Sequence, residues 1–273
     1  MTEKVGLLLY PLIHVFGFDI EVYLVFIGAG IVAVTVFNAF RRKKLNLKGW
    51  ELILLLTLTL ALMLAFCRLF YALLMIPVKG ASWETFRNDL LHGGMVFYGG
   101  MFGIVAGCAL FALVRRRKAR EVLDFFAPSI ALSLVFARLG CLFNGCCYGI
   151  ECAFGVPNQK FPGQLLLPVQ LFESAVNLVI FIAFLLRERV KKTNRFHLEA
   201  YFVVYGVARF VLEFFRGNSD RMYYPDRLSG SQHISILIVL FVLIEAAVLT
   251  VRKSKKSNQK RPDDPAERKS YET

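Results

Sequence analysis

The chain has 273 residues, of which 56% are hydrophobic and only 19% charged, and its net charge is +13. This composition excludes a disordered chain, which would lack large apolar residues, and six cysteines are too few for a disulfide-stapled scaffold of this length. Because the apolar fraction is high and the charged fraction low for a soluble domain, we predict an all-α, polytopic membrane protein.

The predicted elements are transmembrane helices, each of which needs about 20 mostly apolar residues to cross a hydrocarbon layer of roughly 30 Å. We expect seven of them, at 19–40, 51–76, 93–114, 121–143, 168–187, 198–216 and 232–251. They form a membrane domain over 1–251, in which a Gly-, Pro- and Asn-rich loop at about 144–167 forms a small cap. Residues 252–273 have almost no apolar content and are expected to be a disordered, basic tail.

The basic residues are unevenly distributed between the predicted loops. Most of the 33 Lys and Arg residues follow spans one, three, five and seven, in 41–48, 115–120, 187–195 and 252–269. Since basic loops stay in the cytoplasm, the amino terminus is expected outside, the carboxyl terminus in the cytoplasm, and the cap on the outer face. Membrane topology therefore explains the net charge, and no nucleic-acid partner is expected.

Ionisable residues inside predicted spans are candidates for function, because charge is costly in a bilayer. Arg68, Arg138 and Arg209 fall at similar depths in the outer halves of spans two, four and six. Their planar guanidinium groups suit phosphate oxygens, so we predict a site for an anionic ligand. Two structural alternatives remain: Arg209 could pair with Glu213 four residues on, and the other two could reach the lipid headgroups.

The third span begins with closely spaced glycines, including Gly99, Gly103 and Gly107. Small residues let membrane helices approach closely, so we interpret these glycines as a packing surface. Tyr98 in the same segment falls near the depth of the arginines, which makes it a further candidate for the site.

Four cysteines gather on the predicted outer side: Cys141, Cys146, Cys147 and Cys152. Outside the cytoplasm the default is a disulfide, but four cysteines allow three pairings and the sequence does not choose among them. Free, reactive thiols and a metal site are the alternatives. The C-x4-C-C-x4-C spacing differs from the C-x2-C pairs of a zinc ribbon and argues against the metal.

Four segments together resemble the prolipoprotein diacylglyceryl transferase family. They are GGMVFYGGMFG at 93–103, ARLGCLFNGCCYG at 137–149, PVQLFES at 168–174 and YGVARFVLEFFR at 205–216. The resemblance implies a seven-span bacterial plasma-membrane enzyme whose active site faces outward. It implies two substrates: the donor phosphatidylglycerol, and the lipobox cysteine thiol in the signal peptide of a prolipoprotein, which accepts the diacylglyceryl group. Glycerol phosphate is the by-product, and neither a cofactor nor a metal is implied.

The same resemblance assigns roles to individual residues. The predicted catalytic residues are Tyr98, Arg138, Arg209 and Glu213. The predicted substrate-binding residues are Tyr23, Arg68, Asn144, Gly149, Gln170, Glu173 and Tyr205. The chain departs from the family signature R-x-G-N-x-x-N-x-E, because Cys141 replaces its first Asn and Cys146 its Glu. This departure leaves three alternatives: a paralogue that processes a related lipid, a protein that binds or transports an anionic lipid, and a thiol redox protein.

Overall fold

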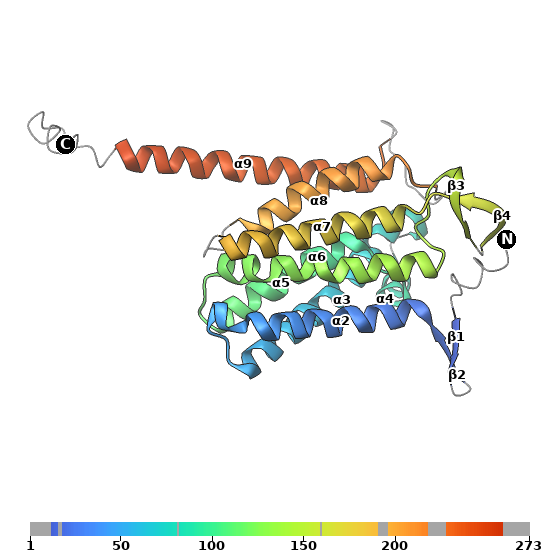
Figure 1. Ribbon diagram of the computed structural model, residues 1–273, viewed down its shortest axis with the longest axis horizontal. Coiled ribbons are helices and arrows are strands. Elements are labelled where there is room, and N and C mark those ends of the chain that lie inside the picture. The colour runs from blue at the N-terminus through green and yellow to red at the C-terminus, as the bar shows by residue number, and fades with distance from the viewer. Residues whose placement is uncertain are drawn as a thin grey trace, which may run out of the picture.

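A computed structural model describes residues 12–15, 18–80, 82–158, 160–190, 196–217 and 228–258. The described chain is mostly helical, with a bundle of long helices and two small β-hairpins at one end (Figure 1). In chain order, the elements are β1 (Leu12–Val15), β2 (Phe18–Glu21), α2 (Val22–Arg41), the 3-10 helix η2 (Arg42–Leu45), α3 (Gly49–Lys79), α4 (Trp83–His92), α5 (Phe97–Val114), α6 (Ala119–Phe143), β3 (Glu151–Asn158), β4 (Phe161–Leu166), α7 (Val169–Val190), α8 (His197–Glu213) and α9 (Gly230–Asn258).

Five of the predicted spans correspond to helices that are long and apolar enough to cross a membrane, namely α2, α3, α5, α6 and α7. The protein is therefore a polytopic membrane protein. The other two predicted spans correspond to α8, which has 17 residues, and to α9, whose apolar part is Gly230–Glu245. Helix α9 continues to Asn258 instead of ending at 251, and residues 259–273 of the predicted tail lie outside the described part of the chain.

The two hairpins correct the prediction that the fold is purely helical. Strands β1 and β2 pair in antiparallel fashion, and the first long helix begins at Val22 instead of residue 19. Residues 18–21 alternate apolar and acidic side chains, the pattern of a strand, and the apolar run begins only after them. Strands β3 and β4 form the second antiparallel hairpin, within the predicted cap segment.

Helices α3 and α5 are in close contact along the predicted glycine surface. A Cβ atom built on Gly103 would lie 2.3 Å from the Leu62 carbonyl oxygen, and one built on Gly107 would lie 2.6 Å from the Thr59 Cα atom. Only glycine permits these approaches, so the structure supports the interpretation of a packing surface.

The buried core is centred on α5 and α6, and α3, α7 and α8 also contribute to it; Phe111, Phe125 and Tyr201 are fully buried there. At the end of the bundle that carries β3 and β4, helices α6 and α8 end while α7 and α9 begin (Figure 1). Polar residues near these four helix ends therefore lie close together, although the sequence separates them widely.

Candidate active site

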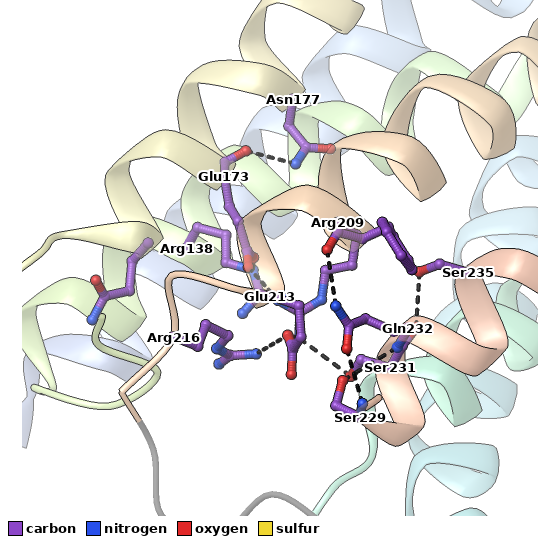
Figure 2. A network of polar contacts seen from close by, with 12 residues as sticks. Arg138, Glu173, Asn177, Arg209, Glu213, Arg216, Ser229, Ser231, Gln232 and Ser235 are labelled. Atoms are coloured by element: carbon purple, nitrogen blue, oxygen red, sulfur yellow. Dashed lines mark hydrogen bonds and ion pairs between the residues drawn. The ribbon is translucent and has the colours of Figure 1, made fainter. Parts of the chain in front are cut away.

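Glu173, in the first turns of α7, is the centre of a buried network of charges. Its Oε2 atom lies 2.5 Å from Arg138 Nε, and its Oε1 atom accepts a hydrogen bond of 2.7 Å from Arg209 Nη1. The three side chains are between 2% and 8% exposed. Figure 2 shows them converging from α6, α7 and α8. One carboxylate thus holds two guanidinium groups that are 71 positions apart in the chain (138 and 209).

Glu213 extends this network at the end of α8. Its Oε2 atom lies 2.9 Å from Arg209 Nη2, so the predicted pair four residues apart does form, and 3.6 Å from Arg216 Nη1. Three guanidinium groups therefore face two carboxylates, which leaves one formal positive charge. A buried cluster with this excess favours an anion that carries a single charge.

The start of α9 closes one side of the network with polar groups. Arg209 Nη2 donates to Ser231 Oγ over 3.3 Å. The Tyr98 hydroxyl donates to the Ser231 carbonyl over 2.9 Å and lies 3.1 Å from Ser235 Oγ. Gln232 and Ser229 bond to each other's backbone amides and so cap this helix end (Figure 2). The structure thus brings Tyr98 and Arg209, two predicted catalytic residues, to one serine.

Aromatic rings form another wall of the site. The Arg138 guanidinium lies 5.4 Å from the centre of the Phe97 ring, and Phe97 contacts Tyr205, which is stacked on Tyr201. The buried Tyr205 hydroxyl has no hydrogen-bond partner among the described residues, and the Tyr201 hydroxyl donates to Asn177 Oδ1. Tyr205 therefore offers a free hydroxyl next to the arginines.

The loop after α6 is attached to α7 and to the end of α8. Gln170 Nε2 donates to the Cys146 carbonyl over 2.6 Å, and Asn144 Nδ2 lies 4.0 Å from Cys146 Sγ. Gly149 forms a β-bridge with Arg216, and a Cβ atom built on it would lie 2.7 Å from the Leu167 carbonyl oxygen. Gly149 is thus needed where the loop passes close to a neighbouring backbone.

A cavity of about 140 Å³ lies between this loop, the β3–β4 hairpin and the start of α7. Asn144 and Gln170 line it together with Lys160. The cavity therefore connects two predicted substrate-binding residues with a basic residue of the hairpin turn.

All six cysteines, each in the described part of the chain, are free thiols. The Sγ atoms of Cys141, Cys146 and Cys147 lie within 4.8 Å of one another, whereas Cys152 stands apart from them in β3. Hydrogen bonds from Cys141 and Cys146 lower the pKa of the Cys147 thiol below its usual range, and the nearby Arg216 and Arg138 guanidinium groups act in the same direction. The predicted cluster of four is thus a cluster of three free thiols.

Two predicted binding residues lie outside the charge network. Arg68 is on α3, which packs mainly against α5 and α4, and its guanidinium donates to the Leu91 carbonyl. Tyr23 lies on α2 against Gly140 and within electrostatic range of Cys141 and Arg138. The proposed trio of arginines at one depth is therefore replaced by Arg138, Arg209 and Arg216, because helix packing and not depth decides which side chains meet.

Several residues of the network were not predicted. Arg216 follows Glu213 by three positions, which is the spacing of neighbours on one helix face and could have signalled it. Polar residues that interrupt an apolar helix were the other available signal; they are Asn177 in α7 and Ser231, Gln232 and Ser235 in α9.

Comparisons with known proteins agree with this arrangement. A sequence model of the prolipoprotein diacylglyceryl transferase family matches residues 11–248. A phosphatidylglycerol–prolipoprotein diacylglyceryl transferase 2 from Clostridium perfringens is 27% identical over 90% of this chain and 98% of its own length. Phosphatidylglycerol–prolipoprotein diacylglyceryl transferases from Clostridium tetani and Helicobacter hepaticus are 29% and 31% identical, over 84% and 63% of this chain and 93% and 62% of theirs. With the family match extending over most of the chain, the protein belongs to the prolipoprotein diacylglyceryl transferase family.

Proposed function

We propose that this protein transfers the diacylglyceryl group of phosphatidylglycerol to the lipobox cysteine thiol of a prolipoprotein. The acceptor sulfur attacks the glyceryl carbon that carries the phosphate. An S–C bond forms, the C–O bond to the phosphate breaks, glycerol phosphate leaves with the bonding electrons, and the thiol proton is released. The family membership and the names of the relatives support both substrates.

The observation that carries this proposal is the sharing of Glu173 by Arg138 and Arg209 in a buried network with one excess positive charge. The phosphodiester of phosphatidylglycerol carries one negative charge and balances that excess. Among the described contacts, Arg138 uses only Nε for its ion pair, so both Nη groups can donate to phosphate oxygens. Such donors stabilise the negative charge that grows on the leaving phosphate as the C–O bond breaks.

The other site residues support binding and proton transfer. Tyr98 or Glu213 serves as the general base for the acceptor thiol or orients that base. Tyr205 offers its free hydroxyl beside the arginines, and Asn144, Gly149 and Gln170 shape the loop next to them. Tyr23 and Arg68 are assigned to the periphery, where they contact the lipid.

The site faces the outer side of the bacterial plasma membrane, with α8 and α9 as the sixth and seventh spans. The basic segments after α2 and α5 and at the end of α7 lie at the end of the bundle opposite the hairpins (Figure 1). Acidic residues contact these segments: Arg41 with Glu188, and Arg115 with Glu51. By the positive-inside rule this end is cytoplasmic, which puts the network and the 144–167 cap outside.

The direct test uses the purified full-length protein in phosphatidylglycerol micelles with a synthetic lipobox peptide. Peptide mass and released glycerol phosphate are followed together. We expect a mass gain of one diacylglyceryl group with an equal amount of glycerol phosphate, and its loss in Arg138→Ala. Arg87→Ala, which removes an exposed arginine of α4, is the matched control and is expected to keep full activity.

Folded protein that binds the lipid but adds no mass to the peptide would overturn the transfer reaction. A mass gain that survives in Arg138→Ala would overturn the phosphate role of Arg138.

A further inference from the structure

Three thiols beside the charge network form a compact set of soft ligands. Cys141 lies in the last turn of α6, and Cys146 and Cys147 lie in the loop that follows it. Their Sγ atoms are within 4.8 Å of one another, and all three side chains are partly buried. Three sulfurs on one tetrahedral Zn²⁺, with Zn–S bonds of about 2.3 Å, lie about 3.8 Å apart. The observed spacing therefore requires only small movements to hold such an ion.

The backbone holds the loop in this arrangement. The Cys146 amide donates to the Cys141 carbonyl over 3.2 Å, and the Cys146 carbonyl accepts the hydrogen bond from Gln170. Gly145 and Cys147 both have left-handed backbone conformations, with φ of 62° and 61°. A non-glycine residue adopts this conformation at a cost of about 1–3 kcal/mol, so the fold maintains the turn that carries the third thiol to the other two. This turn brings together cysteines whose sequence spacing is unlike that of a zinc ribbon.

The surroundings suit a thiolate-bound cation. Three thiolates on a divalent ion carry one net negative charge, and the Arg138 and Arg216 guanidinium groups are close enough to Cys147 to act on it electrostatically. Thiolate ligands select thiophilic ions such as Zn²⁺ over Mg²⁺ or Ca²⁺. Three protein ligands with an open fourth position are the pattern of catalytic zinc sites, whereas structural sites use four.

We propose that Cys141, Cys146 and Cys147 bind one thiophilic divalent cation of the zinc class and leave its fourth position open for the acceptor thiol. The second half of this proposal rests on the proposed function. The acceptor thiol releases its proton to water when it binds the cation as a thiolate. Its sulfur then attacks the glyceryl carbon of the lipid, and glycerol phosphate leaves with the electrons of the broken C–O bond.

Metal content tests the first half without any activity assay. Full-length protein is purified with a phosphine reductant, incubated with Zn²⁺, desalted and analysed for zinc by mass spectrometry. We expect one zinc per chain in the wild type and in Cys152→Ser, which changes a cysteine outside the cluster. Cys147→Ser and Cys141→Ser should each weaken zinc binding by at least about tenfold. If Cys141→Ser does not fold, Cys147→Ser in the loop carries the test.

Cobalt tests the open position. In Co²⁺-loaded protein, a lipobox peptide should increase the sulfur-to-cobalt charge-transfer absorption, and the same peptide with Ser in place of Cys should not. An equal response to both peptides would overturn the role of the fourth position.

Zinc-free wild type, or equal zinc in the wild type and Cys147→Ser, would overturn the metal site. A disulfide among the three cysteines in protein alkylated before lysis would do the same. Both readouts are independent of the transferase assay, so the metal site and the proposed function can fail separately.

Discussion

At the scale of single residues, Glu173 controls the electrostatics of the site. It is almost wholly buried, and it separates two guanidinium groups that would otherwise repel each other. Removing one partner of a buried ion pair is much more costly than the pair's net contribution, because the remaining charge stays without compensation. The carboxylate of Glu173 is therefore required by the two arginines, whatever the ligand.

Glu173→Gln keeps the size of the side chain and removes its charge. We expect the free energy of unfolding to fall by about 3–5 kcal/mol, because Arg138 and Arg209 lose their shared counter-charge. Thermal unfolding in detergent measures this loss, and Glu151→Gln, on an exposed position of β3, is the matched control. Equal midpoints for the two variants would show that Glu173 does not stabilise the arginines.

Arg138→Lys tests the use of the guanidinium group. Lys has a single ammonium group and cannot hold Glu173 while presenting two further donors to a phosphate. We expect kcat/KM for the lipobox peptide to fall by about 100-fold or more, the cost of losing one charge-stabilising donor in an active site. Arg87→Lys should be unchanged, and wild-type kcat/KM in Arg138→Lys would contradict a forked contact with the phosphate.

At the scale of elements, the site depends on helices that are held together without polar contacts. Helix α5 carries Tyr98, and its position is set by the glycines that contact α3. Without a hydrophobic driving force between helices in lipid, close packing of small residues is a main source of helix association. The glycine surface therefore positions Tyr98 as well as stabilising the bundle.

Gly103→Ala should push α5 away from α3, since the added Cβ would lie 2.3 Å from the Leu62 carbonyl oxygen. We expect a loss of about 1–3 kcal/mol in the free energy of unfolding, as for other overpacked contacts. Gly28→Ala in α2 is the control, because a Cβ there meets nothing within 4 Å. Thermal unfolding of both variants decides; a Gly103 variant as stable as the Gly28 variant would rule out a tight α3–α5 contact.

At the scale of the whole molecule, the arrangement of charges predicts an orientation. The hairpin end carries the charge network, and the opposite end carries the basic loops. This asymmetry makes the two ends distinguishable to a protease that cannot cross the membrane.

A site for a sequence-specific protease, inserted either after Lys160 or after Arg116, measures this orientation. In intact cells without a wall we expect cleavage only at the Lys160 site in the β3–β4 turn. Both sites should be cut after detergent lysis, which controls for access. Cleavage of the Arg116 site in intact cells would reverse the proposed topology.

Much of this architecture follows from the sequence because its signals are local. The lengths of the apolar runs predicted α2, α3, α5, α6 and α7 near their observed bounds. Arg138, Arg209 and Glu213 stood out because charge inside an apolar run is visible without a structure. The hairpins were missed because short strands leave weak signals beside long helices, and α4 was missed because its ten residues are mixed in polarity.

By itself, the sequence determined that the chain is a membrane protein with intramembrane arginines, since segment length and charge are properties of neighbouring residues. Only the tertiary structure decided that Glu173 is shared by Arg138 and Arg209, that Arg216 joins them and Arg68 does not, and that three of four clustered cysteines meet. These facts depend on which helix faces contact each other and on one left-handed turn. Distances between helices are set by packing across the bundle, which no local pattern records.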